Sequence, residues 1–285
     1  MAIADLPFEL LQQIIETHFA NHLPSLKACS LVSWSWRLAT LPTLFSKISI
    51  TFAHGGLGRQ LSSALAQEVP PFLSKSLRYI LIDCFSTYGG AEDLDKVVID
   101  LLPRFPHLCR LSILNSVDRG GEPDFVRVLA KERTSFSNIT YFTLHRPGWP
   151  FYLETLEAFT QLRVLHLIGI NIQYKRPETS DGDIPEMAAS APRLQELGLQ
   201  LAAECFVDLV QWFLEGKKID LTEMKVLRIS MSDGNGEVRC LVDRLVPICG
   251  KHLETLDAEF YCEFKSSMRN TLLCILEKEV LITFM

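Results

Sequence analysis

The chain has 285 residues, of which 48% are hydrophobic and 22% are charged, and its formal net charge is −6. This composition is typical of a globular protein, and the length is sufficient for one large or two smaller domains. Binding to nucleic acid generally requires a basic face, so the acidic balance argues against such a partner. No apolar run approaches the roughly 20 residues that span a bilayer, and the N-terminus lacks the features of a signal peptide. We therefore expect no membrane partner and a cytoplasmic or nuclear location.

The first fifty residues predict three short helices. Pro7 suits the first turn of a helix over residues 6–15, because its missing N–H costs nothing there. Residues 21–24 should break this helix, a second should begin near Ser25, and a third should contain Trp34 and end at Pro42. Three short helices cannot bury enough apolar surface by themselves. Their apolar residues must therefore pack against the rest of the chain or against another protein.

Three segments in this region resemble an F-box over residues 4–49. They are Leu6-Pro-x-Glu-Leu-Leu-x-x-Ile-Ile15, Ser25-Leu-Lys-Ala-Cys-Ser-Leu-Val-Ser-Trp-Ser-Trp-Arg37 and Leu44-Phe-Ser-Lys-Ile48. The ordered set carries the resemblance, because a Leu-Pro pair alone occurs in many proteins. The family usually has a single tryptophan where this chain has Trp34 and Trp36, and only one of the two needs to face inward.

The resemblance implies that these helices bind the Skp adaptor of an SCF-type, cullin-based ubiquitin ligase, while the rest of the chain holds a protein substrate. The family's adaptor-contacting positions correspond here to Leu6, Pro7, Leu10, Ile14, Ile15, Val32 and Trp36. Three other leucines of the region are expected to pack inside the helical unit. These are Leu11, Leu26 and Leu31.

A six-residue pattern, apolar-x-x-apolar-x-apolar, recurs through residues 51–285. Successive copies begin between 23 and 32 residues apart, by subtraction of residue numbers. The copies are Leu77/Ile80/Ile82, Leu108/Leu111/Ile113, Ile139/Phe142/Leu144, Leu162/Leu165/Leu167, Leu194/Leu197/Leu199, Met224/Leu227/Ile229 and Leu253/Leu256/Ala258, with Phe45/Ile48/Ile50 as a further copy beside the helices.

Helical stretches fill the gaps between these copies, at residues 93–102, 125–131, 205–214 and 238–248. Strands that alternate with helices favour parallel pairing. We therefore predict an α/β fold in which a three-helix F-box (residues 1–50) precedes an α/β solenoid with a parallel sheet (residues 51–285). This second part is similar to a leucine-rich-repeat domain, although most copies lack the Asn or Cys that follows the strand in that family; Asn171 and Cys262 could fill the role. A doubly wound α/β domain is the alternative.

The polar positions of the pattern should lie on the face of the sheet opposite the core, because strand side chains alternate. This face is either a protein-contact surface or an ordinary solvated face. Its expected members are Tyr79, Arg110, Tyr141, Arg163, His166, Gln195, Gly198, Lys225, Arg228, Thr255 and Asp257.

The sequence offers no catalytic or metal site. The eight cysteines form no Cys-x-x-Cys pair, and most lie in apolar runs, which predicts buried reduced thiols. There is no phosphate-binding or dinucleotide-binding glycine motif and no spacing that selects a catalytic pair. We therefore expect a substrate-recognition adaptor without enzymatic activity, metal or cofactor. The alternatives are an F-box protein that acts outside a ligase and an α/β enzyme without an identifiable site.

Overall fold

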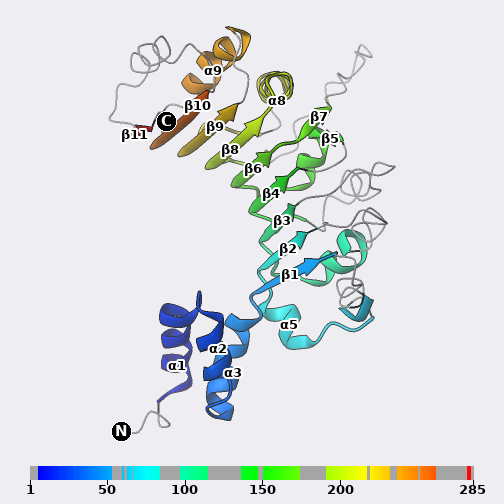
Figure 1. The fold of residues 1–285 in the computed structure, drawn as a ribbon, viewed down its shortest axis with the longest axis vertical. Helices are drawn as coiled ribbons and strands as arrows, with labels where there is room; N and C mark the ends of the chain where they lie inside the picture. Colours follow the sequence, from blue (N-terminus) through cyan, green and yellow to red (C-terminus); the bar gives the residue numbers. More distant parts are fainter. Residues whose placement is uncertain are drawn as a thin grey trace.

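The fold is mixed α/β with one open parallel sheet (Figure 1). The computed structural model describes residues 6–52, 60, 63–65, 67–83, 97–114, 136–146, 150–173, 191–216, 219–231, 236–249, 251–260 and 281–283. The predicted helix at 125–131 and Cys262 lie outside these ranges. None of the helices in the described ranges has the length and apolar character needed to cross a membrane.

The N-terminal helices form close to their predicted positions. They are α1 (Phe8–Ile14), a π-helical turn (Ile15–Phe19), α2 (Leu23–Cys29) and α3 (Trp34–Leu44). The side chain of His22 accepts a hydrogen bond from the Ser25 N–H at the start of α2, and the Ser33 hydroxyl accepts one from the Trp36 N–H at the start of α3. These side chains satisfy N–H groups that the first turn leaves without partners.

The prediction that Pro42 ends the third helix is wrong. Pro42 lies inside α3, which continues for two more residues to Leu44. Proline removes the N–H that would bond to the carbonyl four residues earlier. This loss falls in the last turn of α3, where few helical bonds remain to be broken.

In the described ranges, nine parallel strands form the main sheet in chain order. They are β1 (Lys47–Thr51), β2 (Tyr79–Asp83), β3 (Arg110–Leu114), β4 (Tyr141–His145), β6 (Val164–Ile168), β8 (Glu196–Leu201), β9 (Val226–Met231), β10 (Thr255–Phe260) and β11 (Leu281–Thr283). A doubly wound sheet would reverse its strand order at a switch point, so this order contradicts that alternative. The short strands β5 (Pro150–Tyr152) and β7 (Asn171–Gln173) pair separately. Asn171 is exposed.

The repeated sequence pattern sets the register of the sheet. Ile80 pairs with Leu111, which pairs in turn with Phe142, and each later copy aligns in the same way. The last two apolar positions of the copies thus form two rows across eight strands. From β2 to β10 every member of these rows is at most 3% exposed, so the predicted pattern is confirmed as the core-facing side.

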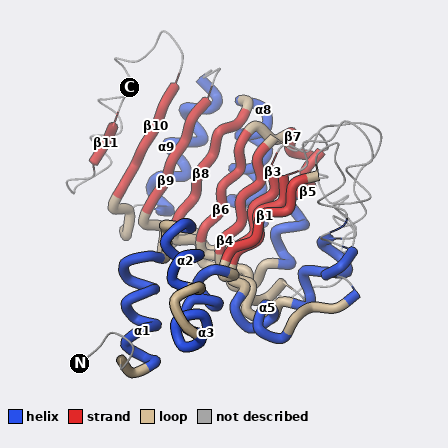
Figure 2. Tube along the Cα trace, turned by 60° about the horizontal axis from the view of Figure 1, so that its bottom comes forward, coloured by secondary structure: helices blue, strands red, loops and turns tan. Residues whose placement is uncertain are grey.

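Helices cover the apolar face of the sheet. The predicted helices at 205–214 and 238–248 are confirmed as α8 (Ala203–Gly216) and α9 (Gly236–Cys249), and Figure 2 shows both on the same side of the sheet. Of the predicted helix at 93–102, residues 93–96 lie outside the described ranges, and the rest forms a π-helical turn (Val97–Leu101) that leads into a 3-10 turn (Leu102–Arg104). Two further helical segments are α5 (Pro71–Ser76) and a 3-10 helix (Leu153–Ala158).

The same hydrogen-bond arrangement joins successive strands at their amino ends. The carbonyl oxygen of Ser46 accepts bonds from the N–H groups of Arg78 and Tyr79, and the carbonyl of Arg78 accepts two from the next strand. Five further carbonyls continue the arrangement, those of Cys109, Thr140, Arg163, Gln195 and Lys225. Each strand is thus hydrogen-bonded at its start to the residue that precedes the strand before it. The same register is therefore kept from β1 to β10.

We expect Leu165→Ala to lower the free energy of unfolding by about 2–5 kcal/mol, because it leaves a cavity in the middle of an apolar row. Leu165 is 0% exposed. Urea unfolding followed by far-ultraviolet circular dichroism measures the change. Lys225→Ala is the control: its ion pair with Glu254 (3.4 Å) joins two side chains more than half exposed, and should contribute less than about 1 kcal/mol. Equal effects of the two substitutions would contradict the assignment of Leu165 to the core.

Candidate functional site

The N-terminal helices expose an unusual amount of apolar side chain. Of the nine large hydrophobic residues that are exposed in the described part of the chain, seven lie between residues 8 and 38. They are Phe8, Leu10, Leu23, Leu31, Val32, Trp34 and Leu38, and we call them the apolar helix surface. Scattered single hydrophobic residues are normal on a protein surface, whereas most of the exposed ones described here fall within one short segment of the chain.

The helices expose this surface because their interior is small. Only Leu11, Ile15, Leu26 and Ala39 are buried in a cluster of their own, separate from the cluster that fills the sheet region. Four buried side chains cannot accommodate the remaining apolar residues of three helices. The exposed residues therefore follow from the size of the unit.

The structure divides the residues that the F-box resemblance assigns to adaptor binding. Leu10 and Val32 are 46% and 64% exposed, and Pro7 is also exposed. Leu6 and Ile14 are partly buried. Ile15 is 0% exposed, and Trp36 packs against the same internal cluster, so both support the surface from within.

The expectation for internal packing is confirmed for Leu11 and Leu26, which are 1% and 3% exposed. It is wrong for Leu31, which is 85% exposed. Leu31 lies between α2 and α3, beyond the turns that pack on one another. Of the two tryptophans, Trp36 faces inward, whereas Trp34 is 69% exposed. This agrees with the expectation that only one of them needs to face inward.

A chain of side-chain contacts crosses the polar face of the sheet. Arg110 stacks between two tyrosines, with its guanidinium carbon 4.9 Å from the ring centre of Tyr79 and 3.7 Å from that of Tyr141. The Lys47 ammonium lies 4.7 Å from the ring centre of Tyr79. Cations over aromatic faces are attracted by the negative charge density of the ring. The contacts therefore fix both cations on β1 and β3.

Hydrogen bonds extend this chain to β9. The Tyr141 hydroxyl lies 3.1 Å from His166 Nδ1, and His166 Nε2 lies 3.0 Å from Glu196 Oε1. The same carboxylate oxygen accepts a bond of 2.5 Å from Arg228 Nη1. Because a carboxylate only accepts, Nε2 of His166 donates to Glu196; when the ring is neutral, its Nδ1 accepts from the Tyr141 hydroxyl. We call the seven residues the cross-strand ladder; they are Lys47, Tyr79, Arg110, Tyr141, His166, Glu196 and Arg228.

Most of the ladder belongs to the polar face that the sequence predicts. Tyr79, Arg110, Tyr141, His166 and Arg228 were all expected there. Sequence reasoning missed Lys47 and Glu196, although both occupy the same register row as Tyr79 and Arg110. Alignment of the repeat copies would have revealed that row, because it immediately precedes the second apolar position.

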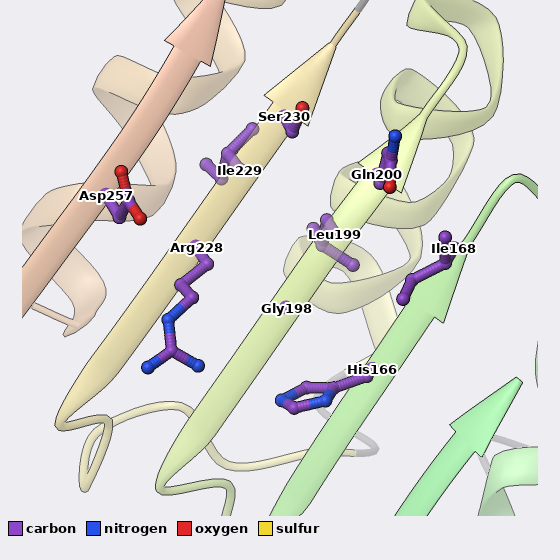
Figure 3. Close-up of a pocket in the computed structure, with 9 residues that line it drawn as sticks. All are labelled: His166, Ile168, Gly198, Leu199, Gln200, Arg228, Ile229, Ser230 and Asp257. Atoms are coloured by element: carbon purple, nitrogen blue, oxygen red, sulfur yellow. The ribbon is translucent and has the colours of Figure 1, made fainter. Parts of the chain in front are cut away.

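A depression of about 310 Å³ lies at the β9 end of the ladder. Figure 3 shows His166 and Arg228 on either side of Gly198, with Asp257 on the next strand. A β-carbon on Gly198 would lie 2.8 Å from His166 Cδ2, so only glycine leaves room for the imidazole ring. The depression therefore exists because β8 carries no side chain at this point.

The described residues do not assemble an evident centre for acid–base or metal chemistry. Burial and then the charge of Arg146 lower the pKa of His145, and burial and then Glu204 raise the pKa of Asp208. Burial also raises the pKa of the Cys249 thiol to about 12. Within the described ranges, no hydrogen bond or ion pair joins any two of these groups, and no cluster of three potential metal ligands occurs.

The cysteine prediction is confirmed in part among the residues that the structure describes. Cys29, Cys109, Cys205 and Cys249 all have free thiols. Only Cys249 is fully buried; the other three are partly exposed. The apolar runs therefore correctly predict that these four thiols are free, but they overstate how deeply three of them are buried.

Gly198→Ala should displace His166 from the cross-strand ladder, and we expect it to lower the free energy of unfolding by about 1–3 kcal/mol, as overpacking does. Urea unfolding measures the effect. In a His166→Ala background the same substitution should lower the free energy of unfolding much less, because the clashing ring is absent. A double-mutant cycle measures the interaction between the two positions. If Gly198→Ala lowers the free energy of unfolding equally in both backgrounds, the position of the His166 ring does not depend on Gly198.

Comparison of the chain with models of known protein families gave no match. Comparison with curated proteins also gave no match. The two surfaces described above, one apolar and helical and one polar and on the sheet, are therefore the features from which a function can be inferred.

Proposed function

We propose that the chain is a substrate-recognition adaptor of an SCF-type ubiquitin ligase. Its N-terminal helices form an F-box bundle that binds the Skp adaptor. Its sheet region forms a leucine-rich-repeat-like solenoid that holds a client protein. Neither part requires catalysis by this chain.

The apolar helix surface is the single observation that carries this proposal. Seven of the nine exposed large hydrophobic residues in the described ranges lie on 31 consecutive residues, from Phe8 to Leu38. Full burial of each aliphatic or aromatic side chain is worth about 1.5–3 kcal/mol. A partner that covered several of them would gain enough to bind stably, and the F-box resemblance of the same residues favours the Skp adaptor as that partner.

The strand order supports the second half of the proposal. Each strand is added beside its predecessor along the chain, and the repeated pattern sets every register. Such one-dimensional addition is the organisation of repeat proteins, whose extended sheet faces commonly bind other proteins. The polar face of this sheet carries aromatic and arginine side chains, which are enriched at protein interfaces.

Co-expression with a Skp adaptor, followed by affinity capture, tests the first half. We expect Leu10→Glu with Val32→Glu to weaken capture at least about tenfold, because both charges would be desolvated at an apolar interface. Both side chains are exposed, so the variant should fold, as circular dichroism can verify.

Ile248→Glu is the matched control for this test. Ile248 is also an exposed apolar residue, at 39%, but lies on α9 far along the sequence. Its substitution should leave capture unchanged. Failure of the natural chain to be captured, or equal loss with the control, would contradict the assignment.

Ubiquitin transfer separates a ligase adaptor from an F-box protein that acts outside a ligase. The reconstituted complex of this chain with the Skp adaptor and cullin should ubiquitinate a protein that the sheet region captures. Stable capture of the Skp adaptor without transfer to a captured client would favour the second role. The Leu10→Glu and Val32→Glu variant serves as the negative control, because it should still capture the client.

A further inference from the structure

The described segments that carry the strands differ in charge from one end of the sheet to the other. The described segments around β1 to β3 (45–52, 67–83 and 97–114) contain five lysines and arginines against three carboxylates. The described segments around β8 and β9 (191–216 and 219–231) contain three against six. Among the described residues, the segments that carry β1 to β3 therefore have a net positive charge, and those that carry β8 and β9 have a net negative one.

The two cations of the ladder at the β1 end are held in place but not neutralised. None of the ion pairs between described residues involves Lys47 or Arg110. At the other end, by contrast, Glu196 neutralises Arg228. The ladder thus holds two cations on one face without placing carboxylates beside them.

Arg110 is prepared for anion binding by its two tyrosines. A guanidinium stacked between rings keeps its N–H groups at the edge of the plane, where a carboxylate can accept two of them. Arg110 is exposed, and among the described residues its guanidinium has no hydrogen-bond acceptor. Tyr141 is itself held by His166 and, through it, by Glu196, so little rotamer freedom remains to be lost on binding.

We propose that the Lys47–Arg110 end of the cross-strand ladder binds an extended, carboxylate-bearing segment of a partner protein. The two cations lie in one register row with one strand between them, which places their backbones roughly 10 Å apart. A segment in the polyproline II conformation advances about 3.1 Å per residue and has three residues per turn, so side chains three residues apart lie on the same side. Two carboxylates in a Glu-x-x-Glu segment of this conformation therefore fit the spacing.

This inference deepens the proposed function by naming the class of client, but its test does not depend on the Skp adaptor. The probe is a fluorescein-labelled peptide, Ser-Glu-Ser-Ser-Glu-Ser, and its partner probe has Gln in place of both Glu. Fluorescence anisotropy with the full chain carrying Leu10→Glu and Val32→Glu, at low salt, measures binding. The outcome is therefore independent of Skp capture.

We expect the Glu probe to bind about tenfold more tightly than the Gln probe, with an affinity that falls as salt rises. Arg110→Gln should abolish this preference. Arg244→Gln removes the same charge from an exposed position on α9, and should retain it. Circular dichroism verifies that both variants fold.

The tyrosine stack can be tested separately as a positioning device. Tyr141→Leu should weaken binding of the Glu probe several-fold, whereas Tyr141→Phe keeps the ring over Arg110 and should restore most of it. Three results would overturn the proposal. These are equal binding of the two probes, an unchanged preference in Arg110→Gln, and binding about a hundredfold tighter when phosphoserine replaces both Glu, which would assign the surface to phosphate instead.

Discussion

The alignment of two apolar rows across parallel strands is the constraint on which the rest of the structure depends. Strand side chains alternate between faces, so a shift of one residue in any strand would exchange its core side with its polar side. The apolar rows at Ile80 and Ile82 continue to Leu256 and Ala258 with every pair in register. Hydrophobic burial thereby fixes the register, and the register determines which polar residues become neighbours on the other face.

The cross-strand ladder is a consequence of that register. Its seven members come from seven strands that are spread over 182 positions from Lys47 to Arg228, by counting both ends, yet each contacts the next. Gly198 completes the arrangement by leaving space for His166. A polar network on a sheet face adds specificity only when its members are mutually satisfied. Here the satisfied end holds Tyr141 in place, and the other end presents cations.

The helical unit obeys a different constraint, namely its size. A cluster of four buried residues organises three helices, and the apolar residues left over form a surface. The junction with the sheet lies between Leu44, which packs on the helical cluster, and Phe45, which packs on the sheet cluster. The ring centres of Phe45 and Phe72 lie 5.3 Å apart in an edge-on arrangement. The helices therefore continue directly into the first strand of the sheet. The proposed adaptor role would need such a connection, because a client must be held at a defined place relative to the other partner.

The sequence by itself determined eight strands of the main sheet, from β1 to β10, with their core-facing residues and parallel pairing, and the positions of α8 and α9; it did not reveal β5, β7 or β11. It could do so because hydrophobic periodicity is local and recurs with each repeat. It also determined that three helices at the N-terminus would lack a sufficient core. Only the tertiary structure decided which of their apolar residues stay outside: Leu31 and Trp34 do, whereas Ile15 and Trp36 do not. Likewise, Lys47 and Glu196 became members of the ladder only through their strand neighbours. Packing between helices and contacts between distant strands depend on residues far apart in the chain, and no local pattern records them.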